Sequence, residues 1–153
     1  MTVTFALGTS NYAYGPDEYV TVGNGISPDQ RYAITAHGRG KLGYDNFHLY
    51  LTDAKTGKNI GVLDEIVETL DTGANAFSAN WSSDSKQVII IYRVDRHAPL
   101  KAVTYVIAGQ RMRCIQGPFN VTSAELVNYW HAHSSAPAPS PKTFGTPLHH
   151  RQN

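Results

Sequence analysis

The stretches ISPDQRYAI (residues 26–34) and WSSDSKQVI (residues 81–89) decide the fold, because they repeat one pattern 55 residues apart. In each, a Ser-x-Asp turn separates an apolar residue from a run rich in strand-forming residues. The Asp side chain of such a turn accepts a hydrogen bond from the backbone N–H group two residues on, which fixes a tight turn directly after a strand. The pattern therefore predicts two strand–turn–strand units, with Asp29 and Asp84 in their turns.

The repeat continues downstream without a gap, where FHLYLTDAKTGKNIGVL (residues 47–63) aligns with AVTYVIAGQRMRCIQGP (residues 102–118). In the first stretch, residues 53–57 (DAKTG) form a hairpin connection whose Gly57 is free to adopt a positive φ. In the second stretch, residues 108–110 (AGQ) take the same place. Each unit therefore predicts two further strands that are joined by a tight turn.

Together these patterns predict a mainly β domain over residues 1–133, with about eight strands in repeat units of about residues 20–63 and 75–118. The composition changes from residue 134 onward, and this last segment holds four of the chain's eight prolines. Because proline removes backbone donors and favours extended conformations, we expect residues 134–153 to form a Pro-rich tail rather than part of the core.

Two other segments show apolar residues at helical spacing. The segment 63–73 has acidic residues early and Gly73 at its end, which favours a short helix, and a loop is the competing interpretation. The segment 121–131 is the better candidate, because Ser123 can cap its first turn and its apolar residues share one face. We therefore expect one short C-terminal helix.

The composition excludes several classes of protein. The chain has 153 residues, and Lys+Arg 13 against Asp+Glu 12 gives a formal net charge of +1, with no general attraction for nucleic acid or acidic lipid. The single cysteine excludes a disulfide scaffold within one chain. No apolar run approaches the roughly 18 residues that a membrane helix needs. We expect no nucleic-acid partner, no membrane contact and no cofactor.

The N-terminal residues MTVTFALGTSNYAYGP (1–16) lack a basic start and a long apolar stretch, so no secretory signal is visible. One cysteine and no visible signal are compatible with the cytoplasm. A periplasmic protein whose signal peptide had been removed would have the same sequence, so both compartments stay open.

Three motifs, Ser27-Pro28-Asp29, Trp81-Ser82-Ser83-Asp84 and the hairpin DAKTGK at residues 53–58, resemble two successive blades of a TolB-like or WD-repeat-like β-propeller. The resemblance covers residues 20–118, about two thirds of the chain. A closed propeller takes four or more blades, so two blades cannot close a ring. We therefore expect two blade-like antiparallel sheets packed as a sandwich. The alternatives are a partial propeller that assembles with copies of itself and a piece of a longer protein.

The resemblance implies an architecture more than an activity, since propeller blades serve binding proteins and enzymes alike. Small exported inhibitors and immunity proteins of bacterial antagonism systems sometimes use similar abbreviated blades. The architecture is therefore compatible with an inhibitor or immunity-type protein that recognises another protein.

The loop between the second and third strands of each unit is the candidate binding site. These loops span residues 38–46 (GRGKLGYDN) and 93–101 (RVDRHAPLK). If both units have the same orientation, the loops emerge at one edge and form a basic patch suited to an acidic partner or a phosphate. Its members are Arg39, Lys41, Arg93, Arg96, His97 and Lys101. The competing interpretation is that Asp45 and Asp95 neutralise the patch and that the loops are solvated turns.

No catalytic or metal-binding set stands out. Cys114 lies on a predicted strand and is expected to be a buried, inert thiol. The histidines near the C-terminus lack acidic or thiol companions at ligand spacing, so no metal is expected at His131, His133, His149 or His150. A small enzyme that uses His37 or His97 with a neighbouring Asp stays open as an alternative.

The preferred hypothesis is a non-enzymatic module that binds another protein through the two loops. Tyrosines gather near the start of the chain, and Tyr12, Tyr14 and Tyr19 form either a sticky surface or part of the packing of a first strand. A structural subunit that pairs with another chain through an exposed sheet edge is a further alternative, and a homodimer is compatible with it.

Overall fold

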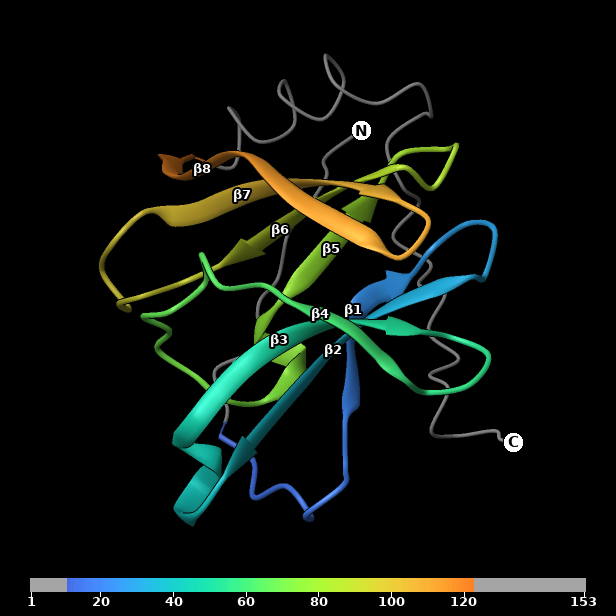
Figure 1. Cartoon of the computed structure of the whole chain (residues 1–153). Coiled ribbons are helices and arrows are strands. Elements are labelled where there is room, and N and C mark those ends of the chain that lie inside the picture. Colours follow the sequence, from blue (N-terminus) through green and yellow to red (C-terminus); the bar gives the residue numbers. More distant parts are fainter. Residues whose placement is uncertain (1–10, 123–153) are drawn as a thin grey trace.

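The computed structural model describes residues 11–122, which form eight β-strands and two short 3-10 turns (Figure 1). The strands are β1 (Val20–Ile26), β2 (Tyr32–Arg39), β3 (Asp45–Asp53), β4 (Asn59–Val62), β5 (Ser78–Trp81), β6 (Gln87–Tyr92), β7 (Leu100–Ala108) and β8 (Arg111–Val121). The turns are η1 (Lys41–Gly43) and η2 (Ala74–Ala76), and they are the only helical elements of the described residues. The predicted mainly β class is confirmed.

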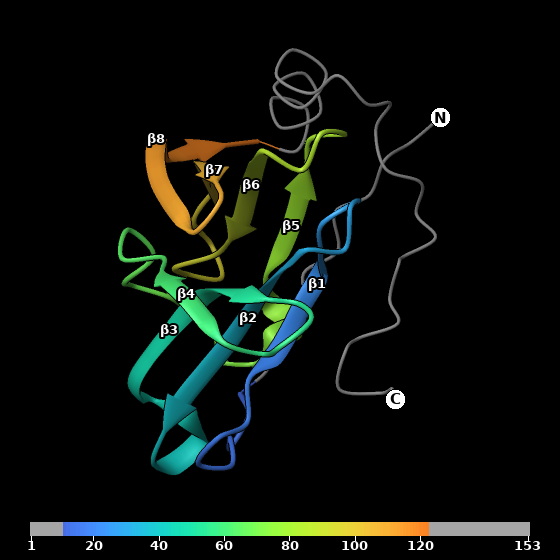
Figure 2. The same ribbon diagram turned by 45° about the vertical axis from the view of Figure 1, so that its right-hand side comes forward.

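All eight strands belong to one curled sheet with the order β4-β3-β2-β1-β5-β6-β7-β8. Strands β1–β4 form one antiparallel meander and β5–β8 form a second. The meanders join through one parallel pair, Gly23 with Ser78, and the Gly23 N–H group donates to the Phe77 carbonyl oxygen at 3.1 Å. The prediction of two separate sheets is therefore wrong, because β1 and β5 meet edge to edge in a half-barrel (Figure 2).

The core lies inside the curl, where one apolar cluster draws residues from both meanders. Its fully buried members include Ile34, Leu49, Phe77, Val88 and Tyr105. Partly buried Ile60 on β4 and Met112 on β8 pack against the same cluster, so the two outer strands close over it. A smaller cluster lies on the other face of the second meander and contains Ile89, Ile91, Ala102 and Val121.

The two meanders turn opposite faces toward the shared core. Ile34 and Ile89 occupy matching positions, seven residues after Ser27 and Ser82. Ile34 belongs to the core cluster, whereas Ile89 belongs to the smaller cluster on the far side. Because side chains alternate across a strand, this difference applies along the whole of β2 and β6. The face of the first meander that lines the core therefore corresponds to the face of the second meander that points away from it, and we call this arrangement front-to-back packing.

The two Ser-x-Asp turns have the conformation that the sequence predicts. The Ser27 hydroxyl donates to Asp29 Oδ1 at 2.7 Å, and the Ser82 hydroxyl donates to Asp84 Oδ1 at 2.7 Å. Each carboxylate also accepts the backbone N–H group two residues on, at 3.0 Å. The Asp29 N–H group donates to Ser85 Oγ at 3.0 Å, so the two turns touch each other. Both predicted turns are confirmed.

The two predicted hairpins are also confirmed. Asp53 Oδ1 accepts the Lys55 and Thr56 N–H groups at 2.8 and 3.0 Å, and Gly57 has a φ of 78°. In the second meander, Gly109 has a φ of 62° between β7 and β8.

The helix expected over residues 63–73 is absent. The segment crosses from the outer edge of the first meander to the middle of the sheet, and it buries Leu63 and Ile66 in the core at 0% and 1% exposure. Leu63 and Ile66 are buried separately as the segment crosses the molecule, so their spacing does not require a helix. The competing loop interpretation is confirmed.

The C-terminal helix expected over residues 121–131 gains no support. Val121 is the last residue of β8, and the rest of the segment lies outside the described residues. The predicted tail, residues 134–153, lies outside them as well.

Candidate functional site

The two predicted loops leave the sheet at the same end, but the crossing segment 63–73 separates them. Strands β2 and β6 run in the same direction, because β1 and β5 are parallel and each pairs antiparallel with its neighbour. The Thr72 hydroxyl donates to the Leu42 carbonyl oxygen at 2.6 Å, and the Leu70 N–H group donates to the Arg93 carbonyl oxygen at 3.0 Å. Figure 1 shows the crossing segment between η1 and the β6–β7 connection.

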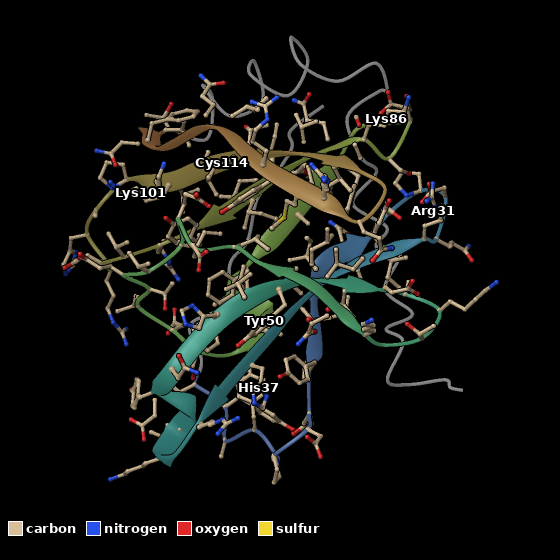
Figure 3. All side chains as sticks on the ribbon, in the orientation of Figure 1. Arg31, His37, Tyr50, Lys86, Lys101 and Cys114 are labelled. Atoms are coloured by element: carbon tan, nitrogen blue, oxygen red, sulfur yellow. The ribbon has the colours of Figure 1, made fainter. Side chains whose placement is uncertain are left out.

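The six predicted basic residues therefore fall into two groups. Arg39 at the end of β2 and Lys41 within η1 are exposed. In the second group, Arg96 and His97 are exposed, whereas Arg93 and Lys101 are half-buried. Figure 3 places Lys101 on β7, well away from the η1 turn. The structure does not gather the six side chains into one patch.

The two aspartates that were expected to neutralise these residues have different roles. Asp45 is the cross-strand partner of Arg39, so the two side chains are neighbours on one face. Asp95 accepts the backbone N–H group of His97 at 2.8 Å, which makes it a turn residue. Each aspartate thus supports one part of the competing interpretation: Asp45 lies beside a basic residue, and Asp95 fixes an exposed turn.

The η1 turn has an unusual backbone. Gly40, Leu42, Gly43 and Asn46 all have positive φ values, of 70°, 54°, 70° and 51°. A left-handed conformation costs a residue such as leucine about 1–2 kcal/mol, because its Cβ crowds the following carbonyl oxygen. Strain of this kind persists only where the surroundings fix it, and it is concentrated at functional sites.

Thr72 supplies that fixation. Its side chain is 3% exposed, and its hydroxyl accepts the Tyr12 N–H group at 3.1 Å while donating to Leu42. Its carbonyl oxygen accepts the Tyr14 hydroxyl, and its N–H group donates to Asn11 Oδ1 at 3.2 Å. One buried residue therefore ties the N-terminal segment to the η1 turn.

Three large apolar side chains are exposed around this turn: Tyr12 at 42%, Leu42 at 39% and Tyr44 at 55%. We call these three residues the Leu42 patch. The Asn11 side-chain amide donates to the Tyr44 hydroxyl at 2.8 Å, and the Tyr12 hydroxyl donates to Glu18 Oε2 at 2.6 Å. The bond to the Glu18 carboxylate raises the pKa of Tyr12. Both tyrosine rings are therefore held in place rather than left loose on the surface.

The sequence suggested a sticky surface for Tyr12 but gave no role to Leu42 or Tyr44. A usable signal was present in GRGKLGYDN, where a leucine and a tyrosine stand in a polar, Gly-rich loop without any strand pattern. Such residues have no predicted core to face, so exposure is the simplest expectation.

Two residues considered for chemistry, His37 and Cys114, are at least partly buried. His37 is buried, and its Nδ1 lies 2.6 Å from the Glu18 carbonyl oxygen rather than from an aspartate. Cys114 is half-buried rather than buried as predicted, and burial raises the pKa of its thiol. Within residues 11–122, no three His, Cys, Asp or Glu side chains lie close enough together to hold a metal ion.

Comparison with protein-family models gave no match, and neither did comparison with curated proteins or with solved structures. In the described part of the chain, no helix has the length and apolar character needed to cross a membrane. The function is therefore inferred from the residues of the chain itself.

Proposed function

We propose that this protein is a non-enzymatic module that binds another protein, with the Leu42 patch at the centre of the contact surface. One observation carries the proposal: Leu42 is held in a strained, left-handed conformation with its side chain exposed, and the anchored side chains of Tyr12 and Tyr44 near the same turn are exposed as well. Large apolar and aromatic side chains that reach solvent from a fixed backbone are typical of the centre of protein interfaces.

The hydrogen bonds around Thr72 favour tight binding because they order the surface in advance. Ordering a loop and its side chains on binding costs about 0.5–1.5 kcal/mol for each immobilised flexible side chain. The bonds to Leu42, Tyr12 and Tyr44 remove much of that cost before the partner arrives.

The basic residues have a secondary role in this proposal. Arg39 and Lys41 lie next to the patch in sequence and form a rim that favours a partner with acidic groups around an apolar depression. Arg93, Arg96, His97 and Lys101 would meet the same partner only if its surface extends past the crossing segment. An inhibitor or immunity-type role is compatible with such a surface.

We also propose that the fold is related to propeller blades of the TolB-like or WD-repeat-like kind. Each meander has four antiparallel strands, as a propeller blade does. The front-to-back packing of the two meanders supports the same idea, because blades repeated around an axis present opposite faces to their neighbours.

The long outer strand β8 is a poor partner for edge-to-edge pairing, which disfavours the structural-subunit alternative at this edge of the sheet. Pro118 has no N–H group to donate, and the pairing of β8 with β7 shifts register twice. Proline and irregular register are common features of sheet edges that do not pair with other chains.

A capture experiment tests the proposal. The tagged protein and its Leu42→Asp variant are incubated with an extract of the native host, and the bound proteins are compared. We expect a protein that the wild type retains and that Leu42→Asp loses. The control is Ile115→Asp, because Ile115 on β8 is similarly exposed at 43% and lies outside the patch. Equal capture by all three proteins would contradict the proposal.

A further inference from the structure

Two histidines face each other across neighbouring strands of the first meander. His37 on β2 is the direct cross-strand partner of His48 on β3, so both side chains leave the same face of the sheet. This is the face away from the core, because the alternating residues Ala36 and Leu49 belong to the core cluster. The pair is independent of the Leu42 patch, so this inference does not rest on the proposed function.

The ring of His37 carries a bare, buried nitrogen. Its Nδ1 lies 2.6 Å from the Glu18 carbonyl oxygen, which can only accept, so Nδ1 is the protonated nitrogen. The opposite nitrogen, Nε2, therefore has a lone pair, and it is buried without a partner. The residue is 3% exposed, and the Tyr19 ring stacks on it with 4.2 Å between ring centroids.

His48 has the same arrangement with its nitrogens exchanged. Its Nε2 donates to Asn46 Oδ1 at 3.1 Å, so Nδ1 has the lone pair, and this atom is buried without a partner. A polar atom buried without a partner costs about 1–3 kcal/mol, so two such atoms on paired residues call for an explanation.

We propose that His37 Nε2 and His48 Nδ1 together bind one divalent transition-metal ion of the copper, nickel or zinc type. Imidazole suits these metals, and a ligating histidine usually donates its other N–H group to a carbonyl or amide oxygen, as both rings do here. Cross-strand Cβ atoms lie about 4.5–5.5 Å apart and zinc–nitrogen bonds measure about 2.0–2.1 Å, so two imidazoles on such a pair of residues are close enough to share one ion.

The surroundings of the pair fit a site with two protein ligands. Tyr50 lies beside His48 and beside the Tyr19 ring that covers His37, with centroid distances of 6.2 Å to His48 and 5.1 Å to Tyr19. Figure 3 shows His37 and Tyr50 on this part of the first meander. The remaining coordination positions would belong to water. Tyr19, which is half-buried over His37, is the side chain whose movement would admit the ion.

Calorimetric titration of the full chain with zinc chloride and with nickel chloride tests this inference. The background protein carries alanine at His131, His133, His149 and His150, which removes the histidines outside the described residues. We expect this background protein to bind one ion per chain. Adding His48→Gln, which changes a half-buried side chain, is expected to weaken binding at least ~10-fold.

Two further variants separate direct ligands from general effects. Asn46→Ala leaves both imidazoles in place but removes the oxygen that orients His48, and it is expected to weaken binding about 10-fold. His97→Gln alters an exposed histidine on the β6–β7 connection and is expected to change nothing. A second readout is the thermal unfolding midpoint, which the metal should raise in the background protein and not in His48→Gln.

Absence of stoichiometric binding in the background protein would overturn the inference. Equal binding by the background protein and by His48→Gln would overturn it as well, since the ion would then lie elsewhere.

Discussion

The two meanders share one architecture and differ in the connection between their second and third strands. In the first meander, this connection is the strained η1 turn, which exposes Leu42 and is fixed by Thr72. In the second, it is a polar turn in which Asp95 accepts the His97 N–H group. The matching Ser-x-Asp turns show that the strand scaffold tolerates either connector. The proposed contact surface therefore lies on the connector in which the two meanders differ.

The meanders also differ in the environment of a tyrosine that their sequences share, Tyr50 in the first and Tyr105 in the second. A gap-free alignment places Tyr50 on Tyr105, yet the strand pairing of Ile34 with Leu51 and of Ile89 with Thr104 places the two tyrosines two positions apart. Tyr50 lies on the outer face beside His48, whereas Tyr105 is 1% exposed in the core and donates to Glu65 Oε1 at 2.9 Å. An identical residue in two similar stretches thus need not have an identical role.

The largest expected effect comes from the end of the first strand in each meander. Trp81 is 6% exposed, stacks on Tyr32 and donates its Nε1–H to the Gly25 carbonyl oxygen at 3.1 Å. Trp81→Ala is expected to lower the free energy of unfolding by about 3–5 kcal/mol, measured by urea denaturation. The matching residue Ile26 is half-buried outside the core cluster, so Ile26→Ala should cost clearly less. Equal losses would contradict the front-to-back packing.

The next effect separates the two connectors. Thr72→Val removes the hydroxyl that donates to the Leu42 carbonyl oxygen and accepts the Tyr12 N–H group, so both partly buried bonds are lost. We expect the free energy of unfolding to fall by about 1–3 kcal/mol, together with weaker partner binding. Thr56→Val, at an exposed position in the β3–β4 hairpin, is the control and should leave binding unchanged. A Thr72→Val variant that loses stability but binds the partner as the wild type does would show that the Leu42 patch does not depend on Thr72.

A smaller effect tests whether the two Ser-x-Asp turns are equivalent. Each Asp→Ala substitution, at Asp29 or at Asp84, is expected to lower the free energy of unfolding by about 1 kcal/mol in urea denaturation at neutral pH. Burial opposes the charge of Asp29, but hydrogen bonds from Ser27 and Arg31 outweigh it and lower its pKa. The bonds from Ser82 and Lys86 likewise lower the pKa of Asp84.

The sign of the pH dependence follows from these lowered pKa values. The contribution of each carboxylate is fully present above the ordinary aspartate pKa of about 3.9, and it is lost as the pH falls through the lower folded-state value. The difference in stability between the wild type and the double alanine variant should therefore shrink below pH ~4. A difference that stays constant with pH would argue against charged carboxylates in the turns.

The smallest effect has the opposite sign. Leu42→Gly relieves a left-handed strain of about 1–2 kcal/mol and adds unfolded-state entropy worth about 0.5–1 kcal/mol, so a net gain in stability of about 0.5 kcal/mol is expected. Partner binding should nevertheless weaken, because the exposed side chain is lost. Thermal unfolding and a binding titration measure the two effects. A variant that is less stable and binds normally would contradict the role given to Leu42.

Local chemistry made much of the scaffold predictable from the sequence. Asp29, Asp84 and Gly57 act through hydrogen bonds and φ values within a few residues, so a short stretch of sequence contains the whole cause. The single sheet was not predictable in this way, because it depends on one pairing between Gly23 and Ser78, which lie far apart in the chain.

The candidate site was predictable only in part. Arg39 and Lys41 do lie at an exposed turn, as the loop pattern indicates. The position of Leu42 depends on Thr72, thirty residues away, and no periodicity connects the two. The separation of the two loops likewise results from the crossing segment, whose buried Leu63 and Ile66 imitate helical spacing.

The join between the two meanders has a consequence for how the molecule responds to damage. Within the sheet only Gly23 and Ser78 pair, so the halves are also held in register by side-chain packing, by hydrogen bonds such as that of Trp81 with Gly25, and by the chain segment 63–77. A single proteolytic cut in this segment, on the N-terminal side of Thr72, would leave every strand intact. Thr72, which fixes the η1 turn, would then have no covalent link to the first meander. A nicked protein would then keep its strands but would bind the proposed partner more weakly.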